Sequence, residues 1–155
     1  MIERYSRQEM AKLWTDEYRF QKMLDVELLA TEALVKQGKV PARAYATIRR
    51  KAKINVPRIR AIERDVKHDV IAFVTQVGER IGPESRYLHL GLTSSDVLDT
   101  ALAVQMVEAA DVLLKDLGLL CKETHDYVIR LAPPLIVSHE DLDWMIGQLR
   151  AAFAA

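Results

Sequence analysis

The stretch DVLDTALAVQMVEAADVLLKDLGLLCKETHDY, residues 96–127, decides the fold class of this chain. It contains no proline, and Gly118 is its only weak point for a helix. The residues along one side recur at helical spacing and are mostly apolar, namely Val97, Ala101, Leu102, Gln105, Val112, Leu113, Leu117, Leu120 and Thr124. A helix over this stretch would be roughly 45 Å long at about 1.5 Å per residue. So long an amphipathic helix predicts one member of a helical bundle, contributed to an oligomer or to a longer chain.

Shorter helices are predicted upstream of this stretch, each marked by capping or turn residues. Ser6 and Glu9 fit a capping box at the start of the first helix. Gly38 ends the second, and Gly82–Pro83 ends the last. In chain order these helices span about 6–14, 15–38, 41–52, 57–66 and 70–81.

The tail changes character after residue 127. Pro133 and Pro134 break any helix, residues 135–137 favour a short extended run, and Ser138 with Asp141 resembles a capping box before a last amphipathic helix. The sequence therefore predicts an all-α fold in three parts. These are a small helical N-terminal domain (1–95), one long bundle-type helix (96–127), and a tail with a short C-terminal helix (128–155).

The composition limits the function classes. Lys plus Arg and Asp plus Glu both count 22, so the net charge is zero, which argues against a nucleic-acid binder with a basic face. The single cysteine, Cys121, cannot form an internal disulfide and suits a reducing compartment. No secretory signal or membrane-spanning run is visible, so a cytoplasmic location without membrane contact is expected.

Three hydroxyl residues, Thr93, Ser94 and Ser95, follow Gly91 and stand at the start of the long helix. The first turn of a helix has free N–H groups and the positive end of the helix dipole. The hydroxyls therefore have two interpretations: they cap the helix, or they help its N–H groups hold a carboxylate or phosphate.

Two histidines are candidates for proton transfer. His68 precedes Asp69, and His89 follows Arg86 and Tyr87, but a lone surface histidine is usually inert. The histidines lack the paired spacing of a metal site, and no phosphate-binding glycine loop is present. We therefore expect neither a metal nor a cofactor.

Four segments together carry a family resemblance: Ile2–Arg7, Met10–Thr15, Lys67–Phe73 and Tyr87–Thr100. Over about residues 1–127 the chain resembles adenylosuccinate lyase, a family of the fumarase/aspartase superfamily that serves purine biosynthesis. The resemblance implies an all-α N-terminal domain followed by the first long helix of a central bundle. It also implies a β-elimination that releases fumarate from adenylosuccinate to give AMP.

The resemblance assigns roles to particular residues. Arg4 and Tyr5 correspond to positions at the phosphate and ribose end of the nucleotide. His68 corresponds to one histidine of a catalytic pair near the leaving nitrogen. Thr93 and Ser94 correspond to residues that hold the succinyl carboxylate.

Three further residues are assigned to the substrate by the same resemblance, and one departs from the family pattern. They are Lys67, Asp69 and His89. Position 67 is usually arginine in the family, and lysine cannot give the bidentate contact of arginine. Asp65–Val66 stands where the family usually has two threonines.

The family's second histidine segment and its mobile serine loop do not occur in this sequence. The family also builds each active site from three subunits, through bundle helices that this sequence lacks. The resemblance therefore implies a homo-oligomeric protein with part of an active site, inactive alone, binding adenylosuccinate or AMP where that part is formed.

Residues 128–155 resemble the extreme C-terminus of class III pyridoxal-phosphate aminotransferases, with Arg130 at a carboxylate-binding position. No cofactor lysine accompanies it, so we expect a relic rather than a ligand site. This leaves an alternative of another class: a helical oligomerisation or scaffold protein made by fusion of enzyme fragments, with vestigial ligand residues.

Overall fold

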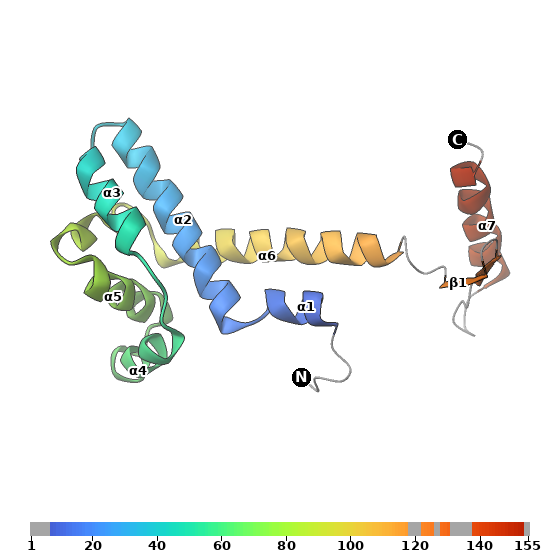
Figure 1. The fold of residues 1–155 in the computed structure, drawn as a ribbon, viewed down its shortest axis with the longest axis horizontal. Coiled ribbons are helices and arrows are strands. Elements are labelled where there is room, and N and C mark those ends of the chain that lie inside the picture. The colour runs from blue at the N-terminus through green and yellow to red at the C-terminus, as the bar shows by residue number, and fades with distance from the viewer. Residues whose placement is uncertain (1–6, 118–121, 126–127, 131–137, 154–155) are drawn as a thin grey trace. The chain divides into compact units, whose positions relative to one another are not determined.

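The computed structural model describes residues 7–117, 122–125, 128–130 and 138–153 (Figure 1). They fall into two compact units, one up to Leu113 and one from Leu114 onward. Each unit is described by itself.

The first unit is built from helices, as the sequence predicts. They are α1 (Gln8–Leu13), α2 (Asp16–Lys36), α3 (Ala42–Lys51), α4 (Val56–Val66), α5 (Asp69–Ile81), the short 3-10 helix η2 (Pro83–Tyr87) and α6 (Ser94–Leu117). Local chemistry explains their starts. The side chain of Thr15 accepts a hydrogen bond from the Tyr18 N–H, and that of Asn55 caps α4 in the same way. The N-cap of α1 is Arg7. The predicted capping box depends on Ser6, which lies outside the described residues.

The core of this unit is formed by α2, α3, α4, α5 and the start of α6. The rings of Phe20 on α2 and Phe73 on α5 stack with centroids 5.9 Å apart. Val97 and Ala101 place the start of α6 in the same cluster, and both are buried. Burial of these apolar side chains is the main stabilising contribution to the unit.

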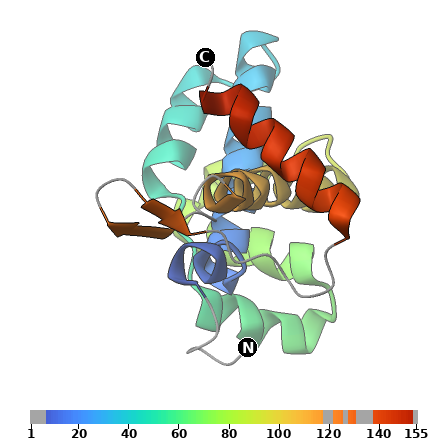
Figure 2. The ribbon, with the colours of Figure 1, turned by 90° about the vertical axis from the view of Figure 1, so that its right-hand side faces the viewer.

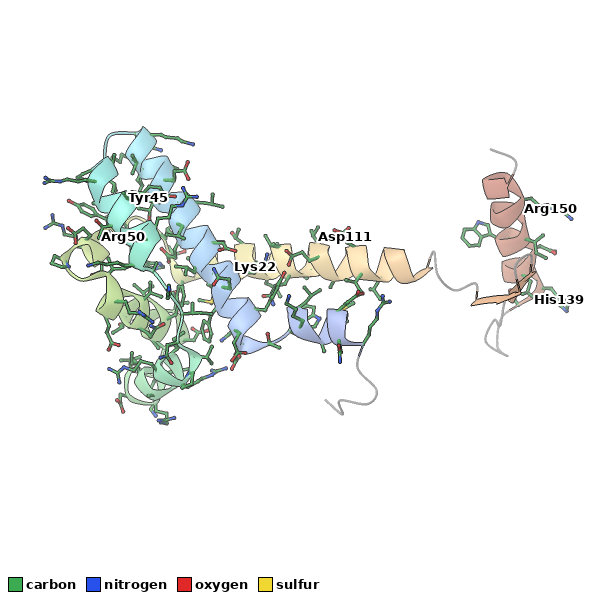
Figure 3. The ribbon with its side chains drawn as sticks, viewed as in Figure 1. Lys22, Tyr45, Arg50, Asp111, His139 and Arg150 are labelled. Carbon is green, nitrogen blue, oxygen red and sulfur yellow. The ribbon has the colours of Figure 1, made fainter. Side chains whose placement is uncertain are left out.

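Helix α2 crosses α6 at a steep angle, as Figure 1 and the view along α6 in Figure 2 show. Polar contacts fix the crossing. Lys22, labelled in Figure 3, has its Nζ 2.6 Å from Glu108 Oε1. The Tyr18 hydroxyl donates to Glu108 Oε2 over 2.9 Å. The bond to Glu108 raises the pKa of Lys22, although partial burial opposes it.

Helix α6 has two unlike sides within the described first unit. Val97, Ala101, Gln105 and Ala109, four residues apart, are buried against the other helices. Leu102, Met106, Val107 and Leu113 are exposed, with 62% of Val107 accessible. An apolar face of this kind is what a helix of a bundle presents to further helices.

The predicted end of the long helix at Tyr127 is wrong, because α6 ends at Leu117. Gly118 follows directly, and glycine costs a helix about 1 kcal/mol relative to alanine. Within the second unit, β1 (Lys122–His125) pairs antiparallel with β2 (Val128–Arg130). The division of the chain at residues 95 and 127 otherwise stays a prediction.

The last helix, α7 (His139–Phe153), follows Ser138 as predicted. The extended run expected at residues 135–137 lies outside the described residues. The all-α fold class is confirmed, with the β1–β2 hairpin as a small addition. None of the described helices combines the length and apolarity needed to cross a membrane.

Candidate functional site

His68 stands at the N-cap of α5, directly after a left-handed turn. Lys67, at φ 55°, ends α4, and its main-chain N–H bonds to the Glu63 carbonyl over 2.9 Å. The ring Nδ1 of His68 accepts from the Ile71 N–H over 3.4 Å. Since Nδ1 acts as an acceptor, the neutral ring carries its proton on Nε2. His68 is therefore oriented by capping, with a donor nitrogen left over.

Asp69 is committed to contacts within the fold. Its Oδ1 accepts from the Val70 N–H over 2.8 Å, and its Oδ2 lies 3.8 Å from Arg19 Nη1 on α2. The guanidinium of Arg19 also lies 4.6 Å from the centroid of the Phe20 ring. These contacts tie the start of α5 to α2, so they fix where His68 stands.

His89 lies in the loop between η2 and α6 and is held by Glu27. Glu27 Oε1 lies 2.6 Å from His89 Nδ1, and Glu27 Oε2 accepts from the His89 main-chain N–H over 2.8 Å. Glu27 has 0% exposure, whereas 24% of the His89 side chain is accessible. A buried carboxylate requires such partners, because its loss of hydration is otherwise uncompensated.

Thr93 and Asp96 form a reciprocal cap at the start of α6. Asp96 Oδ2 accepts from the Thr93 N–H over 2.7 Å and from the Thr93 hydroxyl over 2.9 Å. The Thr93 hydroxyl in turn accepts from the Asp96 N–H over 3.4 Å. These bonds lower the pKa of Asp96, the one from the Thr93 N–H most of all, and the charge of His89 adds to the effect.

Of the two interpretations of this helix start, capping is therefore realised at Thr93. Asp96 occupies the place at which an external anion would meet the Thr93 hydroxyl. Ser94 is the first residue of α6 and is half-buried. A substrate carboxylate at Thr93 and Ser94 stays a prediction, and it requires the Asp96 carboxylate to give way or to share these donors.

Helix α2 is what relates the two histidine segments. Arg19 contacts the His68 segment through Asp69, and Glu27 contacts His89. These two α2 residues are eight positions apart, which corresponds to about 12 Å along the helix. Within the described part of the chain, no hydrogen bond or ion pair joins residues 67–69 directly to His89, Thr93 or Ser94. Arg4 and Tyr5 lie outside the described residues.

Glu27 and Arg19 are the residues that sequence reasoning missed. Glu27 falls between Met23 and Thr31 on the buried stripe of α2, at helical spacing. A carboxylate on such a stripe signals a partner elsewhere, but it does not say which residue.

A hollow of about 380 Å³ lies beside α3 and η2 and is lined in part by Arg43, Thr47, Arg86 and Tyr87. None of the predicted site residues that the structure describes lines this hollow.

Comparison with known proteins gives the class. A profile of the family described as Lyase matches residues 3–126. Adenylosuccinate lyase of Synechocystis sp. is 43% identical, over 97% of this chain and 38% of its own length. Adenylosuccinate lyase of Bacillus subtilis is 50% identical, over 76% of this chain and 27% of its own.

Solved structures agree in fold. A fumarate lyase from Mesorhizobium sp. BNC1 superposes with a TM-score of 0.72 over 96% of this chain and 39% of its own, at 20% identity. A 3-carboxy-cis,cis-muconate lactonizing enzyme from Pseudomonas putida gives a TM-score of 0.69 at 31% identity, covering 75% of this chain and 28% of its own.

The chain therefore belongs to this family of lyases, within the fumarase/aspartase superfamily. Within it, the relatives named above place the chain beside the N-terminal part of adenylosuccinate lyase. The chain spans between 27% and 38% of the length of these relatives. The match to the Synechocystis protein extends into the tail, and none of these comparisons tests the aminotransferase resemblance of residues 128–155, which stays a prediction.

Proposed function

We propose that this chain contributes part of the active site of an adenylosuccinate lyase, which eliminates fumarate from adenylosuccinate to give AMP. The observation that carries the proposal is the 43–50% identity to adenylosuccinate lyases over the region that contains His68, His89 and Thr93. The positions of these residues at helix starts and in one loop are compatible with it, because such places offer donors to an anionic substrate.

The elimination needs a base, an acid and anion donors. A base removes the proton beside a substrate carboxylate, while an acid protonates the departing nitrogen. We assign His68 to the histidine pair near that nitrogen, since its Nε2 carries the proton that a donor needs. Lys67, Asp69, Thr93 and Ser94 would line the substrate, and Arg4 and Tyr5 would hold its phosphate and ribose end.

The proposed site is a partial one. The family pattern requires a second histidine and a serine loop, and neither segment is found in this sequence. We therefore expect no turnover by the chain alone, no cofactor, and activity only when other subunits or chains supply the missing groups. The exposed apolar side of α6 is where a homo-oligomeric bundle would form.

A titration with adenylosuccinate tests the proposal. We expect the amide resonances of His68, His89 and Ser94 and the ring resonances of the two histidines to shift, with no fumarate signal in the same sample. His68→Asn removes the imidazole but keeps a good N-cap side chain, so it should weaken binding while the helix content is retained. Arg50→Ala, on the exposed face of α3 (Figure 3), is the matched control and should bind like the parent. Equal binding by His68→Asn and the parent chain would refute the assigned role.

An assembly function is the second candidate, and the outer side of α6 favours it. Leu102 and Leu113 are 45% and 55% exposed within a long helix. Leu102→Glu with Leu113→Glu should shift the chain toward monomer in sedimentation analysis, whereas Asp111→Ala on the same helix should not. If the chain assembles and its sedimentation is unchanged by both leucine substitutions, this candidate function is excluded.

A further inference from the structure

Glu27 is the only fully buried acidic side chain among the described residues, and both its oxygens contact one residue. Oε1 lies 2.6 Å from the ring Nδ1 of His89, and Oε2 accepts from the His89 main-chain N–H over 2.8 Å. The two residues are 62 positions apart in sequence. The carboxylate therefore fixes the loop backbone and the ring together.

The loop conformation at His89 needs this support. His89 has φ 61°, in the left-handed region that costs a non-glycine residue free energy. Such a conformation persists only where the surroundings hold it, and the bond from its N–H to Glu27 is the contact that does so. Glu27 therefore sets where the imidazole stands, in addition to how it is turned.

The same contact fixes the proton on the ring. An ionised carboxylate can only accept hydrogen bonds, so Nδ1 of His89 must be the donor. Nε2 is then the nitrogen that gains and loses a proton. Among the described residues, nothing bonds to Nε2, and the side chain is partly accessible.

Two carboxylates face His89, from the two helices that enclose its loop. Glu27 of α2 contacts the ring directly, and Asp96 of the first turn of α6 is near enough for the charge of His89 to lower the Asp96 pKa. When the ring is protonated, Nδ1–H donates to Glu27 and Nε2–H is the donor left for an anionic oxygen of a ligand.

We propose that Glu27 is a positioning residue, which keeps a proton on Nδ1 of His89, so that Nε2–H of the protonated ring is the donor presented to an anionic oxygen of the substrate. The identity of the substrate rests on the proposed function. The state of the ring does not rest on it, because it follows from contacts within the chain.

Long-range proton–nitrogen NMR of the full chain, labelled at its histidine rings, tests this directly. In the parent chain we expect Nδ1 of His89 to stay protonated through the ring's titration, with Nε2 as the titrating nitrogen. Glu27→Gln places an amide NH₂ where an acceptor is needed. The neutral ring should then carry its proton on Nε2, and affinity for adenylosuccinate should fall about tenfold through loss of one charge-assisted contact.

Thr31→Val is the matched control. Thr31 is buried on the same helix, and its hydroxyl donates to the main-chain oxygen of Glu27 over 2.8 Å without touching the ring. It should lower thermal stability and leave the ring of His89 unchanged, which separates a positioning role from general loosening of α2.

Two results would overturn the inference: a parent ring whose neutral form carries its proton on Nε2, or a folded Glu27→Gln chain whose ring still carries it on Nδ1. If Glu27→Gln does not fold, the parent spectrum alone decides. If the ring of His89 carries its proton on Nδ1 but its resonances do not change when adenylosuccinate is added, the inference is supported and the proposed function is not. The two failures are therefore distinguishable.

Discussion

The two histidines that the sequence singles out are held in opposite ways. His68 uses Nδ1 as an acceptor for the Ile71 N–H at 3.4 Å, on a partly exposed helix start. His89 has its Nδ1 2.6 Å from Oε1 of Glu27, a side chain with no exposure, and is the donor of that contact in our proposal. In the neutral rings, Nε2 of His68 is therefore a donor, whereas Nε2 of His89 is an acceptor if the proposal holds. The difference shows that the chemistry of a histidine can be predicted only when the contact made by its Nδ1 is known, because that contact decides whether Nε2 donates or accepts.

Removal of the Glu27 carboxylate should have the largest effect on this comparison. In Glu27→Ala the His89 N–H and ring lose their buried partner, and a cavity is left where the Glu27 side chain was. We expect the free energy of unfolding to fall by about 3 kcal/mol, a cost typical of breaking one side of a buried charged contact. Denaturant unfolding followed by circular dichroism measures it. If the free energy of unfolding of Glu27→Ala fell only as much as it does for a substitution at an exposed position, Glu27 would not hold His89 more firmly than the helix cap holds His68.

His68→Ala should cost less, because it removes only a helix cap. We expect a loss of about 1 kcal/mol in the free energy of unfolding, measured in the same way. Asparagine caps helices well, so His68→Asn should recover most of that loss. Equal destabilisation by alanine and asparagine would show that the imidazole packs in the fold rather than caps α5.

The smallest effect concerns the α6 cap and depends on pH. The Asp96 pKa lies below its ordinary value of 3.8, chiefly because the Thr93 N–H bonds to the carboxylate. A lowered folded-state pKa means that this carboxylate stabilises the fold above pH 3.8, and that the contribution is lost as the pH falls through the folded-state value. The melting temperature of Asp96→Asn should therefore approach that of the parent chain as the pH is lowered. A difference that stays constant with pH would exclude the reciprocal cap.

Local patterns predict the helices of the first unit well. The predicted helices over 15–38 and 57–66 correspond to α2 and α4, which begin at Asp16 and Val56, and the hydroxyl run stands at the start of α6 at Ser94. These signals lie within a few residues of what they specify, so they can be read from the sequence. The end of α6 at Leu117 is not predicted, because residues at helical spacing continue in the sequence as far as Thr124.

The candidate site is less accessible to sequence reasoning. The partner of His89 is 62 residues away, and no local spacing links Glu27 to that loop. The cap at Thr93 was one of two interpretations, and the choice depended on the rotamer of Asp96. Contacts of this kind arise from tertiary packing, so only the presence of a polar residue on a buried stripe hints at them.

The bond from the Ile71 N–H to His68 makes one backbone amide a reporter of charge. A protonated imidazole has donors on both nitrogens, so it cannot accept from Ile71, and the positive end of α5 opposes the added charge. The first turn of α5 should then open more often, and the Ile71 amide should exchange with solvent deuterium faster than expected from pH alone. Hydrogen exchange at a single position can thus follow the ionisation of His68 in the absence of any ligand.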